Sequence, residues 1–235
     1  MRGALAVLRK ELLALFRSPI AYLVPAVFLV GTGCFFTYNV FLTGDATMDE
    51  TFRNMGFLAL VVLPMVSMRA FAQEYSARTM PLLATLPLAP WQIVAGKYLG
   101  AVCMLLLLML GSVVNLVPLY LYGNPETSNI VAGYLGFLLF GMACLALGQF
   151  LSALTRNQIV AALATLCLLL GFWFVGNLES FQRSEALRHL VRQLSFSQHY
   201  GAFLQGLVRS DSVAFFLAVC AAALALNASF LRWQR

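Results

Sequence analysis

Long apolar runs separated by short polar stretches dominate the chain. A membrane-spanning helix needs about 20 mostly apolar residues, and six runs are close to or above that length: 19–42, 54–72, 91–122, 129–153, 157–178 and 212–231. The runs are apolar on every face and show no alternation, which favours helices over the strands of a barrel. The pattern therefore predicts an all-α integral membrane protein with six transmembrane helices, formed as a single domain over residues 1–235.

The composition supports the membrane class. Hydrophobic residues make up 61% of the 235 positions and charged residues only 10%, whereas soluble domains carry roughly 25% charged residues. All five cysteines lie inside apolar runs without C-x-x-C spacing, so neither a disulfide framework nor a zinc site is expected. The first apolar run is too long for a signal peptide and lacks a small-residue cleavage site.

The residues before the first apolar run have a different pattern, MRGALAVLRKELLALFRSP. Leucines recur at steps of three and four residues, and Arg9, Lys10 and Arg17 lie off that stripe. This pattern predicts a basic amphipathic helix over residues 1–18 that lies in the membrane interface. A plain extension of the first span into the cytoplasm remains the alternative.

The distribution of arginine and lysine predicts the orientation, because cytoplasmic loops carry the excess of basic residues. With six spans, one side of the membrane holds ten basic and two acidic residues, and the other holds five basic and seven acidic residues. Both termini and the loop over 73–90 are therefore expected in the cytoplasm. The net charge of +6 then follows from membrane orientation, and no nucleic-acid partner is needed to account for it.

One loop on the opposite side is sizeable, residues 179–211, and it holds both histidines, His189 and His199. Acidic and basic residues at helical spacing predict a short amphipathic helix at the outer surface; they are Glu185, Arg188 and Arg192. Such a loop is too short for a folded domain, and we expect no catalytic role for it.

The spans lack the groups that membrane enzymes use. No histidine or aspartate lies within a span, which argues against zinc proteases, serine–histidine dyads and aspartyl proteases. Gly96-Lys97 is followed by Tyr98, so the P-loop pattern for ATP binding is absent. A few polar residues lie at mid-span depth, where interhelical hydrogen bonding is the commoner role; they are Ser112, Asn115, Gln149 and Thr165. An ion-coupled carrier is correspondingly disfavoured.

Between the second and third runs, residues 78–98 read RTMPLLATLPLAPWQIVAGKY. Thr79 is suited to cap a helix, Pro81 is tolerated in its first turn, and Pro87 prevents its continuation. The result is a helix of about two turns over 80–86 with a leucine face formed by Leu82, Leu83 and Leu86. Because two turns are not stable alone in water, the segment needs a partner surface or the membrane interface. The residues leave both open.

This part of the chain resembles the signature of ABC-2 type permeases. The matching positions are Met68-Arg69, Glu74, Arg78-Thr79, Leu82-Leu83, Thr85, Pro87 and Gly96-Lys97. Two further stretches, LTRNQIVAALA (154–164) and LSFSQHYGAFLQGLVRSDSVAFFLAV (194–219), resemble the branch that contains the gliding-motility permease and the permease for nitrous oxide reductase maturation. Two positions depart from the family pattern: Ala77 replaces a glycine and Pro81 replaces a glutamate.

The resemblance implies a transmembrane permease subunit of an ATP-binding cassette transporter in the bacterial cytoplasmic membrane. It implies a cytosolic ATPase dimer that binds ATP and Mg, a second permease subunit that is identical or related, and a possible accessory protein. The chain itself would hold no cofactor, and the resemblance names no substrate. The residues expected to couple the permease to the ATPase are Arg69, Glu74, Arg78, Thr79, Leu82, Leu83, Leu86 and Pro87.

Two details of this coupling set follow from spacing. Arg69 is expected to extend to the cytoplasmic interface, and Glu74 and Arg78 are expected to pair at i,i+4. Two alternatives to an exporting permease remain: a mechanical or scaffolding subunit without a transported substrate, and a self-contained secondary carrier. A neighbouring reading frame that encodes an ATPase would favour the permease or the scaffolding subunit over the carrier.

Overall fold

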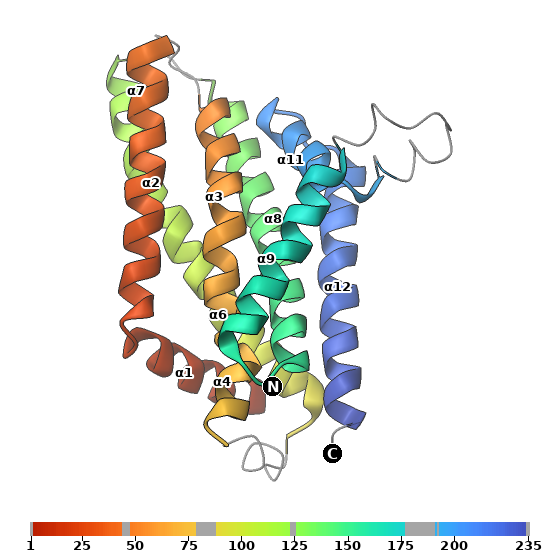
Figure 1. Ribbon diagram of the computed structural model, residues 1–235. Coiled ribbons are helices and arrows are strands. Elements are labelled where there is room, and N and C mark those ends of the chain that lie inside the picture. Colours follow the sequence, from red (N-terminus) through yellow and green to blue (C-terminus); the bar gives the residue numbers. More distant parts are fainter. Residues whose placement is uncertain are drawn as a thin grey trace.

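The computed structural model describes residues 2–43, 48–78, 88–122, 126–176, 191 and 193–233, and these residues form helices without any β-strand. The helices are α1 (Arg2–Phe16), α2 (Ile20–Thr43), α3 (Asp49–Ser67), α4 (Arg69–Ser76), α6 (Pro90–Ser112), the 3-10 turn η1 (Val113–Asn115), α7 (Leu116–Tyr122), α8 (Thr127–Leu154), α9 (Gln158–Phe174), α11 (Phe196–Leu204) and α12 (Ser210–Trp233). Figure 1 shows an upright bundle with α1 lying across one end and α11 at the other. The last turn of α12 lies at the same end as α1.

Five helical segments among the described residues are long and apolar enough to cross a membrane. They are Ile20–Val40, Asp49–Ser76, Pro90–Leu121, Thr127–Leu154 and Ser210–Trp233. Five of the six predicted spans therefore correspond to helical segments of sufficient length and hydropathy. The run expected at 157–178 forms α9, a shorter apolar helix of 17 residues, which lies within the bundle beside the longer helices (Figure 1).

The third long segment is not one straight helix. α6 ends at Ser112, one 3-10 turn follows, and α7 continues to Tyr122. Pro118 lies four residues after Val114 and has no backbone N–H, so the carbonyl of Val114 loses its helical partner. The helix type changes just before this proline, and Figure 1 shows the chain bending between α6 and α7.

The core of the bundle is built around α8, which packs against α3, α6, α9, α11 and α12. Small residues on α8 allow this close approach. A Cβ atom placed on Gly136 would lie 2.5 Å from the Cβ atom of Phe203, and one on Gly148 would lie 2.1 Å from the hydroxyl oxygen of Ser67. Any larger side chain at these two positions would separate α8 from α11 or from α3.

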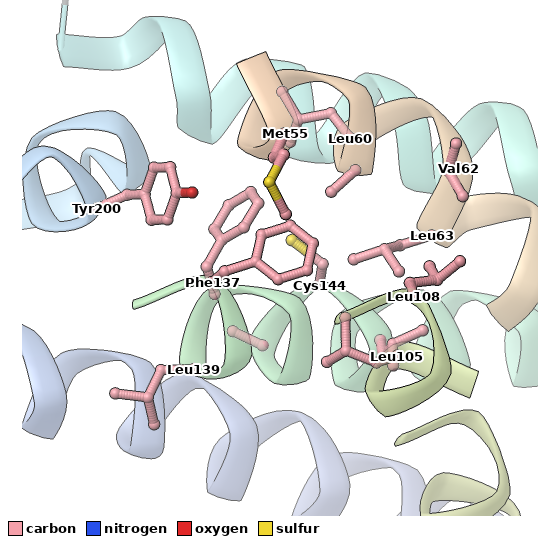
Figure 2. Close-up of a cluster of buried hydrophobic side chains, with 14 of the residues drawn as sticks. Met55, Leu60, Val62, Leu63, Leu105, Leu108, Phe137, Leu139, Cys144 and Tyr200 are labelled. Carbon is pink, nitrogen blue, oxygen red and sulfur yellow. The ribbon is translucent and has the colours of Figure 1, made fainter. Parts of the chain in front are cut away.

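The core around α8 is rich in bulky apolar side chains. Figure 2 shows residues of α3 and α6 gathered against Phe137 and Cys144 of α8, with Tyr200 at one edge. The labelled side chains of α3 and α6 are Met55, Leu60, Val62, Leu63, Leu105 and Leu108, and all are buried. The remaining faces of the long helices expose many large apolar residues, as expected for surfaces in contact with lipid.

The range expected as an outer loop, 179–211, contains the helix α11. Its side chains Phe196, Tyr200 and Phe203 are buried, and the Tyr200 hydroxyl donates a hydrogen bond of 2.7 Å to the carbonyl oxygen of Phe52. Burial raises the pKa of Tyr200, so the phenol keeps the proton that this bond requires. The predicted amphipathic helix around 185–192 lies outside the described residues.

Candidate functional site

Four charged side chains from three helices meet at the end of the bundle where α1 lies. The Nζ atom of Lys97 on α6 lies 2.8 Å from a carboxylate oxygen of Glu11 on α1 and 3.0 Å from one of Glu74 on α4. The Nζ atom of Lys10 lies 3.3 Å from the same oxygen of Glu74. We call Lys10, Glu11, Glu74 and Lys97 the charge cluster; its two positive charges balance its two negative charges.

The members of the charge cluster differ in exposure. The side chain of Lys97 is only 2% exposed and that of Glu74 is 10% exposed, whereas that of Lys10 is 61% exposed. The ammonium group of Lys97 also lies 5.2 Å from the centre of the Phe71 ring, a cation–π distance. A buried ammonium ion is costly unless it is paired, so Lys97 depends on both carboxylates.

The packing of α1 against α6 brings Glu11 to Lys97. Two glycines of α6, Gly96 and Gly100, form the contact surface. A Cβ atom on Gly96 would lie 2.7 Å from the Cβ atom of Val7, and one on Gly100 would lie 3.2 Å from the Cβ atom of Glu11. The G-x-x-x-G spacing at the start of α6 therefore serves contact with the amino-terminal helix α1.

A hydroxyl group from α8 fixes the first turn of α4. The Ser152 Oγ atom accepts hydrogen bonds from the backbone N–H groups of Phe71 and Ala72, at 3.1 and 3.0 Å, and donates one of 2.8 Å to the carbonyl oxygen of Met68. Helix starts leave unpaired N–H groups, and here Ser152 satisfies two of them. This anchor sets the direction of α4 and thereby the position of Glu74.

The arrangement links three helices through paired charges. In the part of the chain that the structure describes, no three histidine, cysteine or acidic side chains lie close enough together to hold a metal ion. The charge cluster joins α1, the short helix α4 and the start of the long apolar helix α6. The segment 79–87 connects α4 to α6 in the sequence.

A comparison with protein-family models supplies the identification. The model described as ABC-2 family transporter protein matches residues 21–224. The chain belongs to this family. The match runs from the start of α2 into α12, so it covers the apolar bundle in which this ABC-2 family transporter carries Glu74 and Lys97. No curated protein gives a significant match to the chain.

The structure describes only some of the predicted coupling residues of this ABC-2 family transporter. Arg69 and Glu74 lie on α4 and Arg78 lies just beyond it. The others, Thr79, Leu82, Leu83, Leu86 and Pro87, lie outside the described residues, as does the predicted helix over 80–86. Of the basic residues assigned to the interfacial helix, Arg9 and Lys10 are exposed on α1, and Arg17 is exposed immediately after its end.

Glu74 and Arg78 do not lie on one continuous helix, as their expected i,i+4 pairing would require. α4 ends at Ser76, and Arg78 has a positive φ of 56°, so the i,i+4 geometry of a continuous helix is lost. Glu74 instead points to Lys97 and Lys10. Similarly, a guanidinium nitrogen of Arg69 donates a hydrogen bond to the hydroxyl oxygen of Ser18, which places Arg69 against the α1–α2 connection.

Lys97 and Glu11 are functional candidates that reasoning from the sequence missed. In the sequence, Lys97 stands out only as a family motif position and as one basic residue in the charge count, and Glu11 only as an acid in that count. A usable signal was present, because a lysine a few residues inside a long apolar run requires a counter-charge nearby. The amphipathic helix before the first span was the segment able to supply it.

The opposite end of the bundle has a histidine in a fixed environment. The Nδ1 atom of His199 lies 3.1 Å from the hydroxyl oxygen of Ser212, and its Nε2 atom lies 3.1 Å from the carbonyl oxygen of Gln193. Its ring stacks on that of Phe215 with the centres 4.2 Å apart. These contacts give His199 a structural role between α11 and α12. His189 lies outside the described residues.

Proposed function

We propose that this chain is the transmembrane permease subunit of an ATP-binding cassette transporter and transmits ATP-driven conformational change across the membrane to export a substrate. The observation that carries the proposal is the family match over residues 21–224 together with a charge cluster that joins three helices beside the segment 79–87. A cytosolic ATPase dimer would bind the ATP and Mg, and a second permease subunit would complete the pathway.

The proposed mechanism begins at the helix expected over 80–86. ATP binding would close the ATPase dimer and displace this helix. Its amino-terminal side continues from α4, which Ser152 attaches to α8, and its carboxyl-terminal side leads into α6. Because Lys97 is paired with both Glu74 and Glu11, α4, α6 and α1 would move together and not independently. The displacement would then reach the long helices as a rigid-body motion.

The proposed topology has six spans and places both termini in the cytoplasm of a bacterial cell. α9 would supply the remaining span, the fifth in chain order. Its length of 17 residues is at the lower limit of the roughly 17–25 residues that a spanning helix needs. The positive-inside rule supports the orientation, because α1 and the end of α12 lie at one end of the bundle (Figure 1), where basic residues are in excess.

The test is affinity purification of the full chain from its own cells, followed by identification of the retained proteins. The expected partner is an ABC ATPase. In Leu83→Asp the ATPase should no longer be retained. The substitution removes the contact of a buried leucine with the ATPase, worth roughly 1.5–3 kcal/mol, and places a charge in the apolar groove of the ATPase that would receive this leucine.

The control for this experiment is Leu106→Met on α6, a substitution of similar volume that is expected to be mild and to keep the ATPase. Membrane insertion is checked in both variants. Retention of the ATPase and of full ATP-driven activity by a correctly inserted Leu83→Asp protein would contradict the coupling role of 80–86. Absence of any ATPase from the wild-type sample would contradict the permease assignment itself.

A further inference from the structure

A cavity of about 270 Å³ lies beside the charge cluster, between α1, the start of α2, the junction of α3 and α4, and α6. Its lining divides into two parts. The polar part includes Arg17, Ser18, Arg69 and Gln73, together with Glu11 and Lys97 of the charge cluster, and the apolar part includes Leu15, Ile20, Val66 and Met104. Drug-sized ligands occupy pockets of roughly 300–1,000 Å³, so this cavity has room for a small polar group but not for a complete lipid.

The charges around the cavity do not balance. Within the charge cluster, Lys10 and Lys97 are compensated by Glu11 and Glu74. Arg17 and Arg69 also line the cavity, and neither forms an ion pair with any described residue. The cavity therefore carries two uncompensated positive charges and is suited to an anion.

One of these arginines has a donor without an acceptor. The Nε–H group of Arg69 is buried and has no hydrogen-bond partner in the described part of the chain, although another nitrogen of the same guanidinium contacts Ser18. Buried donors are paired in the great majority of cases. Arginine holds phosphate through two parallel hydrogen bonds, and the free Nε–H of Arg69 is one of the donors that such a contact uses.

The surroundings of the cavity favour a phosphate that belongs to a lipid. The helix α1 has the basic, amphipathic pattern of a segment that lies in the headgroup layer, and it forms one wall. Tyr22, Leu23 and Leu99, which lie one or two residues from lining positions, expose 66%, 55% and 45% of their surface. These apolar surfaces would contact acyl chains, whereas a free phosphate ion would gain nothing from them or from the apolar half of the lining.

We propose that the cavity binds the phosphate group of an anionic phospholipid, held by Arg69 and Arg17, with Ser18 supporting Arg69. The lipid would occupy the space between the interfacial helix and the bundle and fix α1 against α3 and α6. This inference rests on the cavity and its charges. It does not require the ATPase, so it stands or fails separately from the proposed function.

The experiment uses the purified full chain in a neutral detergent after removal of bound lipid. Dioctanoyl phosphatidylglycerol, dioctanoyl phosphatidylcholine and inorganic phosphate are titrated separately, and bound molecules are counted by native mass spectrometry. We expect one tightly held phosphatidylglycerol per chain, weaker binding of phosphatidylcholine, whose choline is repelled by the arginines, and no retention of inorganic phosphate. Arg69→Gln should weaken phosphatidylglycerol binding about tenfold, as expected when a charged hydrogen-bond donor is removed.

Arg9→Gln is the matched control, because Arg9 is an exposed arginine of α1 that does not line the cavity, and its loss should leave binding unchanged. If Arg69→Gln fails to fold, Arg17→Gln decides the outcome, because Arg17 is exposed and its loss should weaken binding severalfold. Wild-type affinity in Arg17→Gln or in folded Arg69→Gln would overturn the proposal. Equal binding of phosphatidylcholine would show that the lipid need not be anionic, and equal binding of inorganic phosphate would assign the cavity to a free anion. Either result would also overturn it.

Discussion

At the scale of single residues, Lys97 is the side chain on which the site depends most. It is nearly inaccessible to solvent and contacts two carboxylates from different helices. Lys97→Met would leave Glu11 and Glu74 without their buried counter-charge. Removal of one partner of a buried ion pair costs about 3–5 kcal/mol, so we expect a comparable loss in the free energy of unfolding, measured by thermal unfolding in detergent.

The matched control for Lys97→Met is Lys10→Met, which removes an exposed lysine from the same cluster and should cost less than about 1 kcal/mol. Adding Glu11→Gln to Lys97→Met should recover part of the loss, because one uncompensated carboxylate disappears. Equal stability of the Lys97→Met and Lys10→Met proteins would mean that the buried pairs contribute little.

A second residue-scale prediction concerns Asn227 on α12. Its side chain is fully buried, and neither its oxygen nor its nitrogen atom has a partner among the described residues. Asn227→Leu should raise the free energy of unfolding by about 1 kcal/mol or more, because an unpaired buried polar group costs about 1–3 kcal/mol. Gln149→Leu is the comparison: its amide donates to the carbonyl oxygen of Val94, so the gain should be smaller. A loss of stability in Asn227→Leu would show that the amide has partners.

At the scale of helices, the contact between α1 and α6 depends on Gly96. A Cβ atom there would lie 2.7 Å from the Cβ atom of Val7 and 2.9 Å from the carbonyl oxygen of Ala4, and neither atom is the end of a flexible side chain. Gly96→Ala should therefore loosen α1, and backbone amides of α1 should exchange hydrogen faster. Gly171→Ala is the control, because a Cβ atom at that position would have no neighbour within 4 Å among the described residues. Unchanged exchange in Gly96→Ala would contradict the close packing.

The anchor of α4 gives another prediction at this scale. Ser152→Ala removes the acceptor for two buried N–H groups and the donor to Met68, and it should lower the free energy of unfolding by about 1–3 kcal/mol. Ser76→Ala changes an exposed serine of α4 and should stay within about 0.5 kcal/mol. The two are compared by thermal unfolding, and indistinguishable melting curves would show that Ser152 does not hold α4.

The long helices could be predicted well from the sequence, whereas the contacts between helices could not. Apolar runs such as 129–153 and 212–231 gave α8 and α12 to within two residues, because length and hydropathy alone determine such helices. The pairing of Lys97 with Glu11 could not be predicted in the same way, because these residues are 86 positions apart and meet only when α1 folds back onto α6. The buried helix α11 was missed because its aromatic residues become core only after α8 and α12 are in place.

At the scale of the whole molecule, the orientation of the bundle is open to direct measurement. Ser76, the last residue of α4, and Ser210, the first residue of α12, are both exposed. α4 lies at the end of the bundle where α1 lies, and α12 begins at the other end (Figure 1). Single cysteines at these positions, in a chain whose five native cysteines are replaced by alanine, can be treated with a membrane-impermeant maleimide in intact cells. The positive-inside rule predicts labelling at position 210 and protection at 76, and the reverse pattern would refute the proposed topology.

At the same scale, the proposed ATPase drives this bundle through α4 and α6. The most direct test is the distance between spin labels at positions 76 and 210 in the purified complex with its ATPase, recorded without nucleotide and with ATP and Mg. Coupling through α4 and α6 predicts that ATP and Mg shift the distance distribution of the complex. An identical distribution in both states, in a complex that still hydrolyses ATP, would contradict it.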